Sequence, residues 1–405
     1  MHPAEQLVQI MNRIYENKMT TTSGGNLSLV DDKGNIWITP SGVDKGNLTP
    51  IDICCIKPDC TPAKTNRHKP SVEAPVHAMI YRRRPDLKAI VHAHPPSLVA
   101  FSLARKLPRL AADKIESVPY ALPGSMALGE MIADRFAEGV NLVMMESHGA
   151  VAGGTDIFAT FRAFEAFEIA AATEINASKI GAIRNFPKMD KSFVPKEILS
   201  FGHDIAYKLV DFAQRAYRQK LFGALHGVFS ARLNKTEFLI TPAHKDRFYL
   251  EARDMVLVRD GQAENLSFDA QIHSAIYDAH PKVTSIVGAS PPHAMAFAVT
   301  DTVFDSRTIP ESYMMLRHVQ RVPWDVRPIE VAASISDSTP VLILEGRQIL
   351  ATGDSIVKAF DRLEVAEATA CSIIAAKSIG EIKHISAQEV RDIDDKFGLC
   401  VTHAR

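Results

Sequence analysis

Apolar positions recur along the chain with two different periods, and together they predict a mixture of helices and strands. Residues 89–94 and 142–145 are short apolar runs, which are typical of buried strands. Residues 37–40 end a further predicted strand, and a glycine-containing turn follows it. Residues 156–177 carry apolar side chains at helical spacing. This mixture predicts sheets covered by helices, an α/β fold.

Another helix is predicted from the stretch that begins at Pro70. Ser71 is a favourable N-cap, and Glu73 would lie in the first turn, where a negative charge suits the helix dipole. Pro85 ends the helix. The pattern therefore places Glu73 at the start of a helix that precedes the strand predicted over 89–94.

The chain repeats itself. Residues 71–101 and 267–297 align without a gap and are identical at 13 of 31 positions, where roughly two identities are expected by chance. Two shorter blocks align in the same order: 38–40 with 240–242, and 141–154 with 340–353. The chain is therefore predicted to hold two copies of one domain of about 200 residues.

The join between the copies is predicted within residues 181–198, which contain two prolines and several charges and show no clear periodicity. We accordingly predict a first domain over 1–190 and a second over 191–405. The length of 405 residues agrees, because at about 150 residues per domain it suggests two or three domains.

Composition and charge exclude several classes of protein. The chain is 46% hydrophobic and 23% charged, which is not the composition of a disordered, collagenous or disulfide-scaffold protein. Its 46 basic and 47 acidic side chains give a net charge of −1. This balance argues against a nucleic acid or an anionic membrane as a partner bound through bulk charge.

The cysteines and the N-terminus indicate the cellular compartment in which we expect the protein. Five irregularly spaced cysteines without a pair of CxxC motifs favour free thiols in a reducing compartment. The first residues lack the basic and apolar regions of a signal peptide. No apolar run is long enough for a membrane span. We therefore expect a cytoplasmic protein.

Three histidines and a carboxylate are the strongest candidates for chemistry. His92 and His94 are two apart on a predicted strand, so both side chains project from one face and their nitrogens can share a metal ion. His148 follows a later strand, and Glu73 starts the preceding helix. This set suits a tetrahedral zinc site with a catalytic position.

The repeat provides a test of this interpretation. All three histidines are replaced together in the second copy, as expected for residues of one shared site. In the alignment, His92, His94, His148 and Glu73 correspond to Gly288, Ser290, Arg347 and Asp269.

His77 behaves differently, because His273 matches it in the copy that lacks the other histidines. We interpret His77 as a structural, hydrogen-bonded residue, and the matched pair Tyr81 and Tyr277 in the same way.

Two short segments could form an anion pocket. Ser23–Asn26 and Thr39–Gly42 supply backbone amides and small hydroxyls, and Ser71 adds a hydroxyl near a helix start. Such groups bind phosphate. Both segments are equally typical of tight turns, so the pattern alone leaves the two interpretations open.

The combined pattern closely resembles the class II aldolase/adducin family. The motifs that carry the resemblance over most of residues 1–180 are, in order, SGGN (23–26), ITPSG (38–42), KPSVE (69–73), HAH (92–94) and SHG (147–149). Residues 220–375 resemble the same domain without its metal motif. The resemblance implies a three-layer α/β/α sandwich with a mainly antiparallel central sheet, present twice in the chain.

The resemblance also implies a site and a reaction. Zinc, or another divalent transition metal, would be bound by His92, His94 and His148, with Glu73 as the catalytic acid/base. The metal would stabilise the enediolate formed when a sugar or sugar-phosphate-type aldol is cleaved. The residues that match the phosphate pocket of the family are Gly25, Asn26, Ser41, Gly42 and Ser71.

Two positions depart from the family pattern. Val72 stands where the pocket usually has a second serine, which weakens the case for a phosphorylated substrate. The stretch 107–112 lacks the tyrosine that serves the aldolases as proton donor. Tyr120 or a residue of the tail would have to supply that proton.

The resemblance leaves several functions open. A zinc-dependent aldolase that acts on a small carbohydrate-type substrate is the first interpretation. The same metal site also serves epimerases, dehydratases and decarboxylases, and an adducin-like scaffold without catalysis is a further alternative.

The resemblance further implies a homo-oligomer, in which two chains of two domains form a pseudo-tetramer. Arg347 would then place a positive charge in the vacated cavity of the second copy, or it is a surface arginine.

Overall fold

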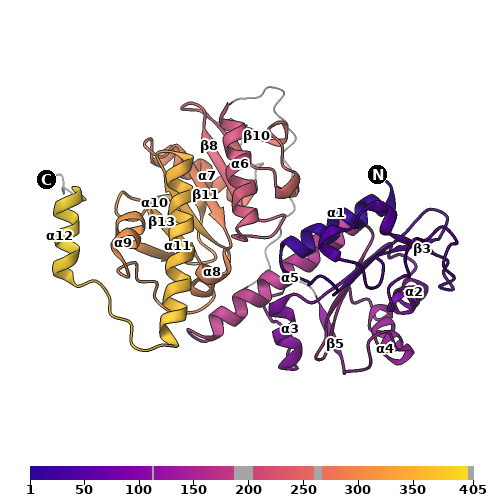
Figure 1. Cartoon of the computed structure of the whole chain (residues 1–405). Helices are drawn as coiled ribbons and strands as arrows, with labels where there is room; N and C mark the ends of the chain where they lie inside the picture. The colour runs from indigo at the N-terminus through magenta and orange to yellow at the C-terminus, as the bar shows by residue number, and fades with distance from the viewer. Residues whose placement is uncertain (112–113, 187–203, 260–266, 400–405) are drawn as a thin grey trace. The chain divides into compact units, whose positions relative to one another are not determined.

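The computed structural model describes residues 1–111, 114–186, 204–259 and 267–399, and the chain divides into two compact units, Met1–Ala172 and Thr173–Arg405 (Figure 1). The predicted boundary between residues 190 and 191 lies outside the described residues, as does most of the predicted linker 181–198. The domain limits 1–190 and 191–405 therefore stay a prediction.

A seven-stranded sheet forms the centre of the first unit, in the order β3-β2-β1-β4-β7-β6-β5. Only β5 and β6 pair in parallel; all other neighbours are antiparallel. The strands are β1 (Asn26–Val30), β2 (Ile36–Ile38), β3 (Cys54–Ile56), β4 (Ala89–Ala93), β5 (Ile115–Val118), β6 (Leu142–Met145) and β7 (Gly149–Gly154). The helices are α1 (Pro3–Glu16), α2 (Ala74–Arg83), α3 (Pro96–Leu103), α4 (Met126–Ala137) and α5 (Ile157–Ser178), which continues into the second unit.

The second unit repeats this topology strand for strand, in the order β10-β9-β8-β11-β14-β13-β12, with only β12 and β13 parallel. The prediction of two copies of one domain is therefore confirmed. The strands are β8 (Val228–Arg232), β9 (Glu237–Ile240), β10 (Val256–Arg259), β11 (Ser285–Ala289), β12 (Val319–Val322), β13 (Val341–Leu344) and β14 (Gln348–Gly353). The helices are α6 (Asp204–Arg218), α7 (Phe268–Ala279), α8 (Pro292–Ala298), α9 (Pro310–Leu316), α10 (Pro328–Ala333), α11 (Ile356–Lys377) and α12 (Ala387–Phe397).

Helices cover both faces of the first sheet (Figure 1). On one face α2 and α4 pack together over a buried core that includes Ile90 of the central strand β4. On the other face lie α1, α3 and α5: the guanidinium of Arg13 in α1 lies 4.6 Å from the centre of the Phe161 ring in α5. Glu168 of α5 accepts the backbone N–H of Ser97 at the start of α3, at 2.9 Å. The predicted three-layer α/β/α sandwich with a mainly antiparallel sheet is confirmed.

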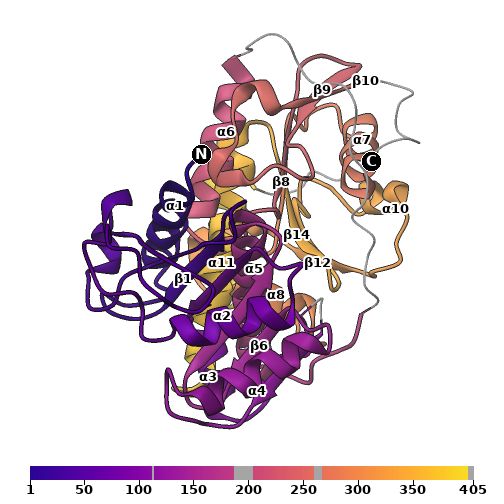
Figure 2. The same ribbon diagram turned by 90° about the vertical axis from the view of Figure 1, so that its right-hand side faces the viewer.

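The second unit has the same layers. Figure 2 shows its strands between α6 and α11 on one side and α7 and α10 on the other. α7 and α10 pack together over a core that includes Ile286 and Leu342. α12 has no counterpart among the described residues of the first unit, and Asp394 ties it to the body of the second unit through Arg317, at 2.6 Å.

The predicted start of the helix at Ser71 is wrong. α2 begins at Ala74, and Glu73 occupies the N-cap position. The Ser71 carbonyl accepts the N–H of Ala74 at 3.0 Å and its hydroxyl accepts the N–H of Glu73 at 3.2 Å, so these residues form a turn before the helix. In the second unit the aligned Ser267 does cap α7, through the N–H of Ala270.

His77 and Tyr81 belong to a buried hydrogen-bond network, as predicted. The hydroxyl of Ser28 lies 2.6 Å from His77 Nδ1 and 2.7 Å from the Tyr81 hydroxyl. In the second unit Ser230 makes the same two contacts with His273 and Tyr277, at 2.7 Å each. The network links α2 to β1 in the first unit and α7 to β8 in the second, and therefore supports the fold rather than the chemistry.

Among the described residues, no helix is long and apolar enough to cross a membrane. The cysteines that the structure describes are all free thiols: Cys54, Cys55, Cys60 and Cys371.

Candidate metal centre

His92 is held in the middle of the first sheet. It lies in β4, which is buried along its whole length and pairs with β1 on one side and β7 on the other. Its Nδ1 lies 3.0 Å from the carbonyl oxygen of Ala150, which fixes the ring and leaves Nε2 directed away from β7. A backbone acceptor on one ring nitrogen is the usual arrangement for a histidine that binds a metal through the other.

His94 follows directly after β4 rather than inside it, because the strand ends at Ala93. Its N–H donates to the carbonyl of Met19 at 3.0 Å, which anchors the residue to the chain before β1. Two glycines leave room for its ring. A Cβ at Gly149 would lie 2.6 Å from His94 Cδ2, and a Cβ at Gly24 would lie 3.0 Å from His94 Nδ1.

His148 lies in the turn between β6 and β7, as the sequence predicted. The preceding residue, Ser147, has a positive φ of 55°, and the aligned Gly346 has a φ of 64°. Both copies therefore make the same left-handed turn, which directs the following side chain back over the sheet.

The three imidazoles converge. Their ring centres are separated by 4.9 Å (His92 and His94), 5.0 Å (His92 and His148) and 5.2 Å (His94 and His148). One nitrogen from each ring lies within 4.8 Å of the other two. Two nitrogens bound to one zinc ion are at most about 4 Å apart, so small ring rotations bring the set to ligand geometry.

Glu73 lies beside the histidines. Its Oε2 is 3.2 Å from His92 Nε2, and its Oε1 is 3.9 Å from His148 Nε2. Asn26 donates from Nδ2 to Oε2 at 2.6 Å. Burial by itself would raise the pKa of this carboxyl, but His92, the hydrogen bond from Asn26 and His148 together outweigh it and hold the pKa below its ordinary value. Glu73 is therefore an anion in a largely buried place.

His94 and His148 are neutral at physiological pH. Burial, and then the neighbouring imidazoles, lower the pKa of His94 to about 3 and that of His148 to about 4. Neutral imidazole is the form that binds metals. The buried ring nitrogen His94 Nε2 has no hydrogen-bond partner among the described residues. Buried polar atoms normally have one, so this nitrogen fits a site that a metal completes.

The sequence model of the Class II Aldolase and Adducin N-terminal domain matches the chain twice, over residues 5–175 and 207–374. The chain belongs to the class II aldolase and adducin family. Members of this family generally depend on a divalent metal, and the three histidines are the group in the described residues that could hold one.

Several relatives cover one copy of the domain. A 5-deoxy-D-ribulose 1-phosphate aldolase of Bacillus thuringiensis is 27% identical over 209 residues, 49% of this chain and 96% of that protein. An L-fuculose phosphate aldolase of Methanocaldococcus jannaschii is 32% identical over 173 residues, 40% of this chain and 91% of that protein. A 3-oxo-tetronate 4-phosphate decarboxylase of Haemophilus influenzae is 31% identical over 165 residues, 38% of this chain and 77% of that protein. The crystal structure of a putative aldolase/epimerase/decarboxylase from Klebsiella pneumoniae is 28% identical, covers 42% of this chain and 86% of that one, and gives a TM-score of 0.39.

Two of the five residues of the predicted anion pocket, Gly25 and Asn26, lie beside the histidines and Glu73. Asn26 contacts Glu73, and Gly25, with a φ of 67°, packs under the His92 carbonyl, where a Cβ would be 2.8 Å away. The turn that holds Ser41 and Gly42 pairs with the segment before Ser71, because the N–H of Ser41 donates to the carbonyl of residue 69 at 2.9 Å. The pocket assignment stays a prediction.

Sequence reasoning missed a buried cation beneath this turn. Lys45 is 2% exposed, and its ammonium donates to the carbonyls of Pro40 and Val43. The aligned Arg247 of the second unit is 1% exposed, and its guanidinium donates to the carbonyls of Pro242 and Lys245, the counterparts of Pro40 and Val43. The alignment of Lys45 with Arg247, a basic residue at the same place in both copies, was the signal that the sequence offered. Both cations stabilise the turn through its carbonyls.

In the second unit, side chains fill the place that corresponds to the three histidines. Arg347, aligned with His148, is not a surface residue: its side chain is 8% exposed and lies 3.6 Å from Asp269. Gln348, aligned with Gly149, donates to Asp269 at 3.1 Å. A Cβ at Gly288 would lie 2.4 Å from the Gln348 side-chain oxygen, so that amide occupies the space beside β11.

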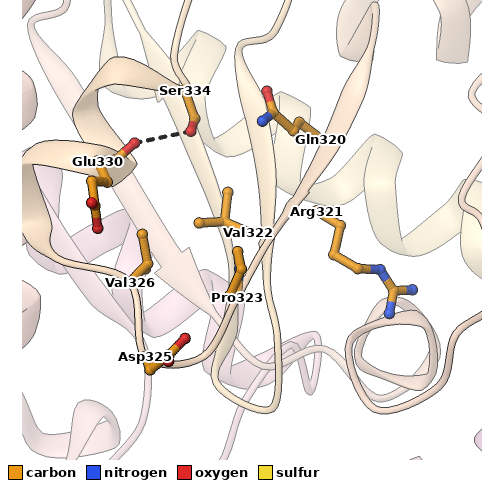
Figure 3. A pocket seen from close by; sticks show the side chains of 8 residues that line it. All are labelled: Gln320, Arg321, Val322, Pro323, Asp325, Val326, Glu330 and Ser334. Atoms are coloured by element: carbon orange, nitrogen blue, oxygen red, sulfur yellow. Dashed lines mark hydrogen bonds between the residues drawn. The ribbon is translucent and has the colours of Figure 1, made fainter.

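A separate cavity of about 410 Å³ lies at the edge of the second sheet (Figure 3). Its walls come from β12, including Arg321, and from α10, where the hydroxyl of Ser334 donates to the carbonyl of Glu330 at 2.9 Å. It shares no residue with the histidine site or with the filled site of the second unit.

Proposed function

We propose that the first copy is a divalent-metal-dependent lyase, an aldolase that breaks a carbon–carbon bond of a sugar or sugar-phosphate-type substrate. The observation that carries the proposal is the convergence of three imidazoles on one point beside an anionic Glu73. The relatives named as aldolases support it. The second copy has Arg347, Gln348 and Asp269 in the corresponding place, and we expect it to bind no metal there.

His92, His94 and His148 would hold the metal, zinc in our proposal, and their three nitrogens leave a coordination position open. Bound there, a divalent cation supplies Lewis-acid stabilisation for negative charge that develops on substrate oxygens. The protein's part is to keep His94 and His148 neutral and to fix the rings. Burial keeps these two imidazoles neutral. The Ala150 carbonyl fixes the ring of His92, and the packing against Gly24 and Gly149 fixes that of His94.

Glu73 is the proposed acid/base. Its Oε2 is occupied by the Asn26 amide at 2.6 Å, so Oε1, which faces His148, is the oxygen free to take or return a proton. Cleavage of an aldol requires removal of a hydroxyl proton and leaves an electron pair on the carbon next to the carbonyl. A carboxylate held anionic at the site is suited to the first of these transfers.

Decarboxylation is the second candidate. It breaks the same kind of bond and leaves the same electron pair, but it releases carbon dioxide and needs no base to deprotonate a hydroxyl. The relative from Haemophilus influenzae named as a decarboxylase favours it, as does the absence of a tyrosine from residues 107–112.

The test begins with metal content. We expect about one zinc per chain in the wild type, none after His92→Ala, and an unchanged content after His318→Ala, which removes an exposed histidine of the second unit. No metal in the wild type would favour a scaffold without catalysis, and two per chain would contradict the assignment of the second copy.

Substrate class is tested next with ketose phosphates, unphosphorylated aldols and β-keto acids. Release of aldehyde identifies an aldolase, and release of carbon dioxide identifies a decarboxylase. Glu73→Gln should retain zinc and lose at least about 100-fold in rate with an aldol. Zinc-loaded enzyme that keeps its full rate after this substitution would refute the assigned role of Glu73.

We further propose that the chain forms a homodimer, a pseudo-tetramer of four domains. Sedimentation of the wild type as a monomer would contradict this.

A further inference from the structure

The segments that follow the long helices α5 and α11 repeat one another in sequence. Residues 177–186 read ASKIGAIRNF, and residues 376–385 read AKSIGEIKHI. The two align without a gap, at the same offset as the blocks 141–154 and 340–353, and share isoleucine, glycine, isoleucine and a basic residue. We call residues 180–186 the first repeat segment and residues 379–385 the second repeat segment.

The first repeat segment packs within the second unit. Ile183 forms an antiparallel bridge with Thr300, and the N–H of Arg184 donates to the carbonyl of Val299 at 2.9 Å. The hydroxyl of Thr302 donates to the carbonyl of residue 180 at 2.9 Å. These contacts hold the segment as a short added strand along the chain that leaves α8.

Side chains of the first repeat segment reach the turn between β13 and β14, which aligns with the turn that holds His148. The guanidinium of Arg184 lies 2.7 Å from Glu345, and a Cβ at Gly346 would collide with the ring of Phe186. The segment that follows the first copy in the sequence therefore covers the second copy, next to the place where a metal ligand would stand.

The second repeat segment is exposed where the first is covered. Ile379 is 87% exposed. No atom lies within 4 Å of a Cβ placed at Gly380, whereas a Cβ at the aligned Gly181 would lie 2.9 Å from the hydroxyl oxygen of Thr302. The end of the segment is held, because the N–H of Ile385 donates to a backbone carbonyl of the second unit at 2.8 Å. The stretch available to a partner is therefore 379–383.

The first unit exposes the surface that the first repeat segment covers on the second. Leu103 is 64% exposed, whereas the aligned Val299 is 4% exposed. Ala104 is exposed, whereas the aligned Thr300 is fully buried. The chain thus contains an exposed segment and an exposed surface, and the counterparts of both are buried against each other in the second unit.

The ion pair of the covered contact is kept in the exposed parts. Lys383 aligns with Arg184, and Glu146 aligns with Glu345. The side chain of Glu345, paired with Arg184, is 9% exposed, and that of Glu146 is 23% exposed. Lys383 against Glu146 would repeat the pair between Arg184 and Glu345.

A second pair of positions changes charge in a complementary way. The bridge in the second unit places residue 182 opposite residue 301, which are Ala182 and Asp301. The residues aligned with them are Glu381 and Arg105. An acid and a base would therefore stand opposite each other in the repeated contact, where complementary charges fix the register.

Resting on the proposed pseudo-tetramer, we propose that residues 379–383 of one chain dock on the first unit of a second copy of this chain, as a short strand along residues 103–106. Lys383 of one chain pairs with Glu146 of the other. In a closed ring each domain makes the same contact with the next. Two of the four contacts then lie within the chains, as on the second unit, and the other two join different chains beside the turn of His148.

A cross-link tests which chain occupies the surface. Ala104 and Ile382 align with the bridged residues Thr300 and Ile183. Opposed residues of an antiparallel pair have Cβ atoms about 4.5–5.5 Å apart, close to the span of a disulfide. We expect the full chain with both Ala104→Cys and Ile382→Cys to form a disulfide that joins two chains on a non-reducing gel. Each single variant controls for the native cysteines and should not form it.

Charge reversal tests the same contact without a new bond. We expect Lys383→Glu to raise the dissociation constant of the two-chain species at least about tenfold in sedimentation equilibrium, because the ring contains the contact twice. Glu146→Lys should act in the same way, and the two substitutions combined should return to within about threefold of the wild type. Lys235→Glu, at an exposed position between β8 and β9, makes the same charge change and should have no effect.

The outcomes separate the docking from the proposals on which it rests. A wild-type dimer that Lys383→Glu does not weaken, or the absence of the disulfide, would overturn the docking and leave the dimer standing. A disulfide within one chain would overturn the second copy as the occupant. A wild type that sediments as a monomer would refute the pseudo-tetramer and the docking together. Zinc content should be unchanged in Lys383→Glu, and a wild type without zinc would refute the metal centre alone.

Discussion

Gly149→Ala and Gly288→Ala place one methyl group at two strand positions that border the corresponding sites of the two copies. Neither glycine has a positive φ, so the alanine backbone is unstrained at both positions. The atoms that the new Cβ would contact differ between the two positions. At 149 it would lie 2.6 Å from the Ala93 backbone oxygen and 2.6 Å from the His94 ring. At 288 it would meet the end of the Gln348 side chain, 2.4 Å away.

The two clashes differ in how they can be relieved. The backbone of residue 93 is fixed in the middle of the sheet, so Gly149→Ala must displace β7 or the imidazole of His94. Overpacking of this kind costs about 1–3 kcal/mol, and displacing a ligand ring reduces metal affinity by about 10- to 100-fold. Gln348 can rotate away from position 288 and lose its 3.1 Å hydrogen bond to Asp269, which costs about 1 kcal/mol.

Urea unfolding of the metal-free chain and competition for zinc against a chelator measure both effects. We expect Gly149→Ala to lose stability and zinc affinity, and Gly288→Ala to lose about 1 kcal/mol with zinc affinity unchanged. Gly380→Ala, at a position with no atom within 4 Å, controls for the substitution itself. If Gly149→Ala bound zinc as tightly as the wild type, the packing of Gly149 against a ligand histidine would be refuted.

Three further predictions concern buried polar groups. Ser28→Ala removes the hydroxyl between two buried partners, and should lower the free energy of unfolding by about 2 kcal/mol with zinc content unchanged; an unchanged urea midpoint would contradict the network. Burial lowers the pKa of both His77 and His273 to about 3, whereas in the unfolded chain it is about 6.5. The unfolded state therefore binds more protons as the pH falls below 6.5, and stability should decrease by about 2 kcal/mol per histidine at pH 5; metal-free protein equally stable at pH 7 and pH 5 would refute this burial. Asp269→Asn should destabilise the second unit by about 3 kcal/mol, because Arg347 keeps its charge in a buried place; differential scanning calorimetry without such a loss would show that the ion pair contributes nothing.

Much of the site could be predicted because the motif residues lie at strand and helix ends. There the hydrophobic periodicity stops and turn-forming residues begin, and both are easily read from the sequence. His92 and His94 converge as their two-residue spacing indicated, although the strand ends between them. Glu73 lies beside them, although the N-cap of the helix is Glu73, two residues after the predicted capping residue Ser71. Terminal positions shift by a few residues because hydrogen bonds from serine side chains compete with the first helical turn.

The sequence by itself determined that the chain holds two copies of one domain, that the histidines are lost from the second as a set, and that His77 is structural. It could do so because aligned residues of the two copies occupy equivalent places in the same fold, so a residue kept in both is one that the packing requires. Only the tertiary structure decided that Arg347 is buried against Asp269, and that Arg184 pairs with Glu345 while the aligned second repeat segment is exposed at Ile379. Arg184 and Glu345 are 161 residues apart in the sequence, so no local period connects them. Whether a buried polar group has a hydrogen-bond partner depends on which groups the folded sheet brings together. The sequence alone does not reveal this.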